Sequence, residues 1–195
     1  MNCAKKGKLF VIAGHSGVGK GTLVALLREK NPEIKLSVSV TTRKPRPGEI
    51  NGVSYFFTEK ETFHEMVKQG CFLEWAEFAG NCYGTDKEIV EKNLAKGQDI
   101  ILEIDVQGAL QVTDKNPEAV LIFIESPSFE ELKSRLLGRK TESEQDIQKR
   151  LSVVEFELAQ KNRFNYSIVN DNLDKAFIEL ENIIKQEMVK NDIIR

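Results

Sequence analysis

Cysteine and histidine, the residues that build disulfide frameworks and zinc sites, are scarce in this sequence. Its 195 residues include three cysteines, Cys3, Cys71 and Cys82, and two histidines, His15 and His64. The cysteines are odd in number, widely spaced and without a Cys-x-x-Cys pair, so we expect neither a disulfide framework nor a zinc site. Free thiols fit a reducing compartment, and we expect a cytoplasmic protein.

Long apolar runs and a large net charge of either sign are also missing. The first apolar run, Leu9–Ala13, is too short for a secretory signal, and no later stretch is long enough to span a bilayer. Lys and Arg number 28 against 30 Asp and Glu, a formal net charge of −2. Because no bulk charge draws the chain to nucleic acid or an anionic membrane, we expect small-molecule partners, with any anion bound locally.

What the sequence does contain indicates one globular unit of the α/β class. Hydrophobic residues make up 41% of it and charged residues 30%, which excludes a disordered or fibrous chain. Short apolar runs alternate with helical periodicity, the pattern of a parallel sheet flanked by helices. Strands are predicted at Leu9–Ala13, Ile100–Ile104, Val120–Ile124 and Tyr166–Val169. Helices are predicted at Thr22–Lys30, Ser128–Leu137, Glu144–Ala159 and Leu173–Val189.

Two segments depart from this alternation. Between about Ser37 and Asp86, short alternating and aromatic runs predict a small, mostly antiparallel insert. It carries one helix, Glu59–Gln69, for which Thr58 is the expected cap. The second segment, Gly138–Asp146, is polar and charged, and we interpret it as a mobile connection between two helices.

The strongest motif follows the first apolar strand and precedes a helix, which is the context that a phosphate-binding loop requires. It reads Gly14-His15-Ser16-Gly17-Val18-Gly19-Lys20-Gly21-Thr22. The glycines permit a backbone curl whose amides point inward, and the helix adds its positive N-terminal end. Lys20 supplies a mobile charge for the β- and γ-phosphates. The alternative, an incidental glycine-rich turn, does not account for this spacing.

One position of the loop differs from the usual pattern. A Ser or Thr normally follows the lysine and binds magnesium, but here Gly21 follows Lys20 and Thr22 comes next. Position 21 therefore offers no hydroxyl to a metal ion, and we assign no residue of the chain as a direct metal ligand.

Five further segments together resemble the guanylate kinase family in order and spacing, over nearly the whole chain. They are Ser37–Glu49, Asn51–Phe57, Glu74–Phe78, Gly80–Thr85 and Glu103–Gly108, joined by Arg135, Arg139 and Arg150 around the polar connection. Three departures are His15, where the family commonly has proline, Gly21, and Cys82, where an aromatic residue is frequent.

The resemblance implies a P-loop α/β enzyme that converts ATP and GMP to ADP and GDP, as a monomer or homodimer. Mg²⁺ would accompany ATP, held by nucleotide oxygens and waters. A single domain of about 7–188 would comprise an ATP-binding core (1–36, 89–127 and 162–195), a GMP-binding insert (37–88) and a helical lid (128–161).

For the GMP site, the resemblance agrees with what the residues can do. Arg43 and Arg46 can present two planar forks to one phosphate, and Tyr55 and Tyr83 offer hydroxyl donors to it. Guanine offers N1–H and an amine as donors and O6 as acceptor, so its pocket needs carboxylates and hydroxyls. The GMP-binding residues carried over are Ser39, Arg43, Arg46, Tyr55, Glu74, Tyr83, Gly84, Thr85 and Asp105.

For ATP, the resemblance assigns residues 14–22 and Asn170, although Asn170 could equally precede a helix capped by Asn172. The catalytic side chains would be Lys20, Arg135, Arg139 and Arg150, which neutralise the transferring phosphoryl group without a general base. The sequence does not divide the roles of Glu103 and Asp105.

Two other functions are compatible with parts of this pattern. Guanylate-kinase-like domains also serve as non-catalytic peptide-binding modules in membrane-associated scaffolds, but those lose the phosphate loop and arginines that this chain keeps. A kinase for another monophosphate is disfavoured by Glu74, Asp105 and the pair Arg43 and Arg46.

Overall fold

The computed structural model describes residues 6–15, 17–78, 80–128 and 153–193. The predicted site residues Ser16, Arg135, Arg139 and Arg150 lie outside these ranges, as do the predicted helix after Ser128 and most of the lid.

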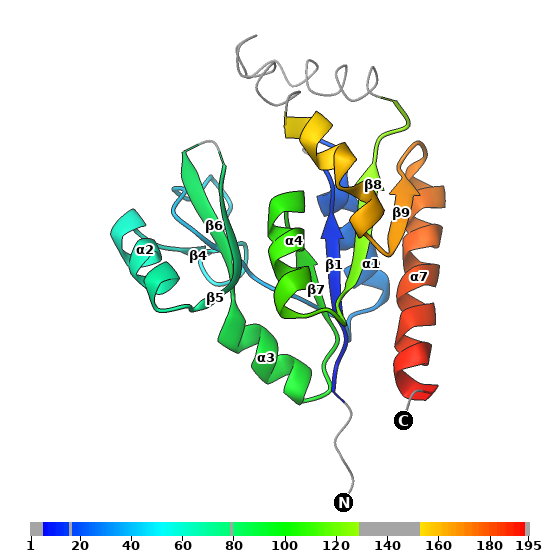
Figure 1. Cartoon of the computed structure of the whole chain (residues 1–195), viewed down its shortest axis with the longest axis horizontal. Helices are drawn as coiled ribbons and strands as arrows, with labels where there is room; N and C mark the ends of the chain where they lie inside the picture. The colour runs from blue at the N-terminus through cyan, green and yellow to red at the C-terminus, as the bar shows by residue number, and fades with distance from the viewer. Residues whose placement is uncertain (1–5, 16, 79, 129–152, 194–195) are drawn as a thin grey trace, which may run out of the picture.

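A five-stranded parallel sheet forms the centre of the molecule (Figure 1). Its order is β2-β7-β1-β8-β9, with β1 at Leu9–Ala13, β2 at Lys35–Leu36, β7 at Ile100–Glu103, β8 at Val120–Glu125 and β9 at Tyr166–Val169. All five residues of β1 are buried, as expected for a central strand covered on both faces. The predicted α/β fold and its four apolar strands are confirmed.

Helices cover both faces of this sheet because alternate residues of β1 point to opposite sides. Phe10 and Ile12 pack with α1 (Lys20–Lys30) and α7 (Leu173–Ile193). Val11 packs on the other face with α3 (Lys87–Ala95) and α4 (Val106–Lys115). Helices α3 and α4, which are short, were not predicted from the sequence.

A smaller four-stranded sheet lies beside the first, with the order β4-β3-β6-β5. Its strands are β3 (Val40–Thr41), β4 (Phe56–Phe57), β5 (Phe72–Phe78) and β6 (Asn81–Asp86). The β5–β6 and β3–β6 pairs are antiparallel and the β3–β4 pair is parallel, so the sheet is mixed.

The helix of the smaller sheet, α2, spans Lys60–Lys68. Its Phe63 is buried and stacks on Phe72 with ring centroids 4.5 Å apart. The prediction that Thr58 caps this helix is wrong. Thr58 still pairs with β3 through its backbone N–H, which donates to the Thr41 carbonyl at 2.9 Å, and Glu59 occupies the cap position without a side-chain bond.

Helix α4 ties the two sheets together. The Gln111 side chain donates to the Trp75 carbonyl at 2.7 Å and accepts from the Trp75 N–H at 3.2 Å. Lys115 donates to the Leu73 and Phe72 carbonyls at 2.6 and 3.3 Å. Both helical residues therefore hold the first half of β5 against the larger sheet.

Residues 153–159 are helical and return the chain to the larger sheet, before a 3₁₀ turn at Lys161–Arg163. Val154 is buried and Leu158 packs against the core of the α3–α4 face. Among the described residues, no helix has the length and apolar character needed to cross a membrane.

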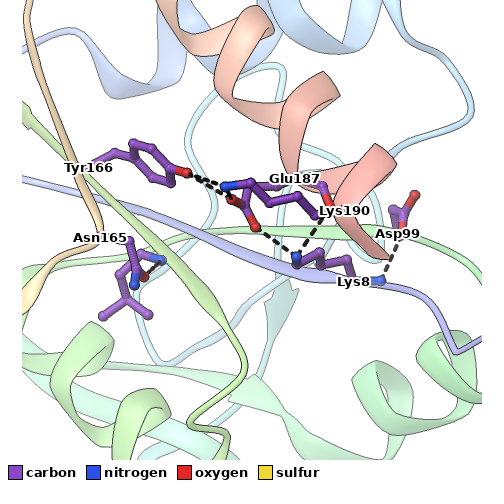
Figure 2. Close-up of polar contacts among 7 residues, drawn as sticks. Lys8, Asp99, Asn165, Tyr166, Glu187 and Lys190 are labelled. Carbon is purple, nitrogen blue, oxygen red and sulfur yellow. Dashed lines mark hydrogen bonds and ion pairs between the residues drawn. The ribbon is translucent and has the colours of Figure 1, made fainter. Parts of the chain in front are cut away.

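The C-terminal helix is fastened to the sheet by Glu187, as Figure 2 shows. Its carboxylate, only 8% exposed, accepts from Lys8 at 2.7 Å, Tyr166 at 2.7 Å and Lys190 at 2.6 Å. Burial alone would raise the pKa of this carboxyl, but the hydrogen bonds from Lys190, Lys8 and Tyr166 outweigh burial and lower the pKa to about 2.

Replacing Glu187 by glutamine should therefore lower the free energy of unfolding at pH 7 by about 1–3 kcal/mol, because two cations lose a buried partner. A carboxyl with a lowered pKa stabilises the fold above its unfolded value of 4.5 and loses that contribution as the pH falls towards 2. Urea unfolding of both proteins should thus show a constant difference above about pH 5 that narrows below 4.5. Glu179→Gln, on the exposed face of α7, is the control and should stay within about 0.5 kcal/mol. A similar loss in both variants would contradict the assignment.

Candidate active site

The loop between β1 and α1 has a backbone that only glycine can supply. Gly14, Gly17 and Gly19 have φ angles of 149°, 86° and 94°. A Cβ atom on Gly14 would lie 2.1 Å from the Ile124 carbonyl oxygen, and one on Gly19 would lie 2.6 Å from Nδ2 of Asn170. The loop curls at the N-terminus of α1, where backbone amides and the helix dipole favour an anion.

Lys20 begins α1 and is enclosed rather than extended into solvent. Its ammonium group donates to the carbonyls of Gly14 at 2.5 Å and His15 at 3.1 Å. Burial lowers the pKa of Lys20, while the carboxylates of Glu157, Glu103 and Asp105 raise it. Lys20 is thus a cation held in a low-dielectric site by acidic neighbours.

Two other loop positions are explained by what lies beside them. A Cβ atom on Gly21 would lie 3.3 Å from Oε1 of Glu103, so glycine leaves room for that carboxylate. Burial raises the pKa of Glu103, and the Lys20 charge opposes the rise. The His15 ring is buried in a T-shaped contact with Phe123, with ring centroids 6.5 Å apart, and the His15 carbonyl accepts from Lys20.

Asn170 lies behind the loop. Its Nδ2 donates to the Val18 carbonyl at 2.8 Å, and its backbone N–H donates to the Glu125 carbonyl at 2.8 Å. Asn172, the alternative cap, accepts from the Lys175 N–H at 3.1 Å near the start of α7. The side chain of Asn170 therefore supports the loop backbone.

A cavity of about 420 Å³ joins the phosphate loop to the smaller sheet. It brings together residues that are far apart in the sequence and that the sequence analysis assigned to one site. Of the predicted residues it is lined by Gly14, Lys20, Ser39, Tyr55, Glu74, Tyr83, Gly84 and Asp105, and further by Glu103 and Glu157. Thr85 lies directly behind Glu74, whereas Arg43 and Arg46 do not line the cavity.

One part of the cavity wall is built around Glu74, which is 4% exposed. The buried Thr85 hydroxyl donates to its Oε1 at 2.5 Å. Burial raises the pKa of the Glu74 carboxyl to about 7, with Asp105 adding to the rise and the Thr85 hydrogen bond opposing it. Gly108 of α4 permits this placement, because a Cβ atom there would lie 2.4 Å from Oε2 of Glu74.

Arg43 follows β3 of the smaller sheet and lies beside Tyr55, which lines the cavity. Its guanidinium donates to both oxygens of Glu49, at 2.7 and 3.0 Å, and lies 5.3 Å from the ring centroid of Tyr55. The Arg46 side chain is exposed, but its backbone N–H also donates to Glu49 at 2.7 Å. The hydrogen bond from Arg43 holds the pKa of Glu49 at about 2. Glu49 therefore orders both arginine positions.

Sequence reasoning assigned no role to Glu49 or Glu157. The signal for Glu49 was its place at the end of the turn that follows Arg43 and Arg46. Glu157 lies on the helix 153–159 at 7% exposure and lines the cavity. The sequence feature that could have identified Glu157 is its place as an acidic residue in the otherwise largely apolar run VVEFEL.

The residues that the structure describes do not form an evident binding site for a metal ion. No group of three or more His, Cys, Asp or Glu side chains there could hold a metal ion.

Comparisons with known proteins agree with this geometry. The family model described as guanylate kinase matches residues 6–187. The chain is 56% identical over 171 residues to the guanylate kinase of Synechococcus sp. (strain CC9311), covering 88% of this chain and 90% of that protein. It is 48% identical over 192 residues to the guanylate kinase of Caldanaerobacter subterraneus subsp. tengcongensis, covering 98% and 93%. The crystal structure of guanylate kinase from Anaplasma phagocytophilum superposes with a TM-score of 0.77 at 33% identity, covering 94% of this chain and 87% of that one.

Proposed function

The chain belongs to the guanylate kinase family and phosphorylates GMP with ATP, and from that premise we propose which of its residues bind each substrate. Residues 1–36, 89–127 and 162–195 form the ATP-binding core, 37–88 the GMP-binding insert and 128–161 the lid. The observation that carries the proposal is that Lys20 and Glu74 line the same cavity.

Guanine binds at the Glu74 end of the cavity. An ionised carboxylate accepts from the N1–H and N2–H of guanine, and the Thr85 hydroxyl fixes its orientation. Ser39 and Asp105 line the same cavity and complete the base contacts. Adenine offers no donor at those two places, so the buried charge would remain unpaired with AMP.

The phosphate of GMP binds between Arg43, Arg46 and the hydroxyls of Tyr55 and Tyr83. Support comes from Glu49, which holds the Arg43 guanidinium against Tyr55 before any substrate arrives. Preordering of this kind reduces the side-chain entropy lost on binding. Tyr83 lies beside Tyr55, with ring centroids 6.2 Å apart.

The phosphates of ATP bind in the loop 14–22, where backbone amides and Lys20 meet them. Asn170 acts on this site through the Val18 carbonyl that it holds. In-line transfer asks little covalent chemistry of the protein, so positioning and charge neutralisation by Lys20, Arg135, Arg139 and Arg150 suffice, without a general base. The three arginines lie outside the described residues.

Mg²⁺ enters with ATP. Gly21 carries no hydroxyl, and the described residues contain no ligand cluster of their own, which fits an ion held by phosphate oxygens and water. Such an ion would neutralise charge on the transferring phosphoryl group.

Arg43→Ala and Arg46→Ala should each raise the KM for GMP by about tenfold or more while the KM for ATP changes by less than about twofold, since one charge-assisted contact is worth about 1.4 kcal/mol or more. ADP release measured at varied GMP and varied ATP gives both constants. Lys44→Ala is the matched control, an exposed cation between the two arginines that should behave as wild type. Equal changes in both KM values would move the arginines out of the GMP site.

A further inference from the structure

The edge of the smaller sheet that carries Glu74 is covered by a helix rather than by another strand. Strand β5 is the outermost strand in the order β4-β3-β6-β5. The outer side of an edge strand presents backbone N–H and C=O groups that the sheet itself does not pair. Here side chains of α4 bond those groups, and they do so at the two residues on either side of Glu74.

The bonds come from two side chains on one face of α4. The Gln111 amide accepts from the Trp75 N–H at 3.2 Å and donates to the Trp75 carbonyl at 2.7 Å, so it pairs with β5 as a neighbouring strand would. Lys115 donates to the Leu73 carbonyl at 2.6 Å. Gly108, Gln111 and Lys115 are three and four residues apart, which places them on the same side of the helix.

A bulge in β5 turns Glu74 towards this helix. The pairing with β6 shifts register between Phe72 and Glu74, so Leu73 is an extra residue of β5. In a regular strand Leu73 and Glu74 would point to opposite faces. Here Leu73 packs in the core of the α3–α4 face, and Glu74 lies against Gly108, where it leaves no room for a Cβ atom. Bulges beside active sites re-aim side chains in this way.

The Glu74 carboxylate tolerates little displacement from this position. The Thr85 hydroxyl of β6 bonds its Oε1, and Gly108 of α4 lies against its Oε2. A shift of β5 along α4 would move the carboxylate relative to the N1–H and N2–H of guanine, and hydrogen bonds weaken steeply when they are misaligned. Gln111 opposes such a shift, because one amide group bonds both backbone polar groups of Trp75.

We propose that Gln111, assisted by Lys115, is a positioning residue for base recognition, because its bonds to β5 hold the bulge that aims the Glu74 carboxylate at guanine. This inference rests on the proposed role of Glu74 in binding guanine. Gln111 and Lys115 do not line the cavity themselves, so both act through the backbone of β5.

A purely structural role is the competing explanation, in which Gln111 only docks the smaller sheet on α4. Loss of such an anchor would lower the melting temperature and would impair the use of GMP and AMP together, leaving their ratio unchanged. Loss of a positioning residue would change the ratio, because adenine has no N–H at the two places that Glu74 meets and gains nothing from its exact placement.

The experiment compares kcat/KM for GMP and for AMP, each at saturating ATP, in wild type and Gln111→Met. Methionine keeps the length of the side chain and removes both bonds to Trp75. We expect the preference for GMP over AMP to narrow by about tenfold, equivalent to about 1.4 kcal/mol, with the KM for ATP within about twofold of wild type. Asp114→Asn, an exposed position on the same helix, is the control and should keep the wild-type preference.

Two further comparisons test the route by which Gln111 acts. Lys115→Met should narrow the preference in the same direction, and Lys115→Arg, which keeps donors for the carbonyls of β5, should narrow it less. In a Glu74→Gln background, Gln111→Met should change the preference by less than about twofold, because residues that act through one another are not additive.

An unchanged preference in a folded Gln111→Met protein, or an equal loss with GMP and AMP, would overturn the proposal. A full further loss in the Glu74→Gln background would also overturn it, since Gln111 would then act by another route. If Gln111→Met does not fold, Lys115→Met, at an exposed position, decides by the same criteria. Failure of the Glu74 assignment is distinguishable, because Glu74→Gln would then itself keep the wild-type preference.

Discussion

Lys20→Met is expected to lower the turnover of GMP phosphorylation by several orders of magnitude in a protein that still folds. Methionine keeps the length and flexibility of the side chain but cannot compensate the charge that develops on the transferring phosphoryl group. Removing Lys20 also removes its own cost of burial, which offsets the partner lost by Glu103, Asp105 and Glu157. The net effect on stability should therefore be small.

Coupled ADP release under saturating substrates, together with thermal unfolding, tests this expectation. Lys175→Met, an exposed substitution on α7, is the matched control and should keep full turnover. If purified Lys20→Met retains more than about a tenth of wild-type turnover, a barrier change under about 1.4 kcal/mol, the phosphate loop does not work as proposed.

Glu74→Gln should weaken the use of GMP and narrow the preference for GMP over AMP by roughly ten- to two-hundred-fold. The reason is chemical rather than steric. A carboxylate offers two acceptors, of which Oε1 is already bonded by Thr85, whereas an amide must present a donor at one of its two positions. A guanine N–H that faces the amide NH₂ has no acceptor, and this loss costs on the order of 1.5–3 kcal/mol of binding free energy.

The measurement is kcat/KM with GMP and AMP offered separately, and Glu65→Gln on α2 serves as the exposed control. A ratio within about twofold of wild type, or less than about 0.5 kcal/mol, would mean that Glu74 does not recognise the base. The wild-type enzyme should also lose GMP affinity as the pH falls below about 7, where Glu74 takes up a proton, and Glu74→Gln should lack that dependence.

Most of the fold could be predicted from short stretches of sequence, because the strands, the glycine loop and the helix starts depend on residues that are close together in the chain. The run Leu9–Ala13 followed by glycines at 14, 17 and 19 predicts a buried strand, a tight curl and a helix start, and the structure has all three. The loop geometry follows from contacts as well as from conformational freedom, since Asn170 and Ile124 occupy the space of the missing side chains.

Other features depend on contacts that no short window of sequence contains. Helix α4 was missed because Val106, Gly108 and Val112 are weak helix formers, and the helix is stabilised by packing on β1 and by the Asp105 cap. Thr58 has the chemistry of a helix cap, yet its backbone pairs with Thr41, seventeen positions away along the chain. The burial of Glu157 likewise arises only when its helix packs against the core of the larger sheet.

The bonds from Gln111 and Lys115 to β5 have a mechanical consequence. These hydrogen bonds fix the smaller sheet at Phe72–Trp75. Any rotation of that sheet that preserves them must therefore have its axis near these residues. Phe78, the last residue of β5 and the one farthest along the strand from these bonds, then moves the greatest distance. Phe78 is 38% exposed and shares the cavity rim with Val153 and Phe156, at 45% and 53%. A rotation that brought β5 towards the helix 153–159 would remove these three apolar side chains from water together, and the hydrophobic effect would then favour the closed arrangement.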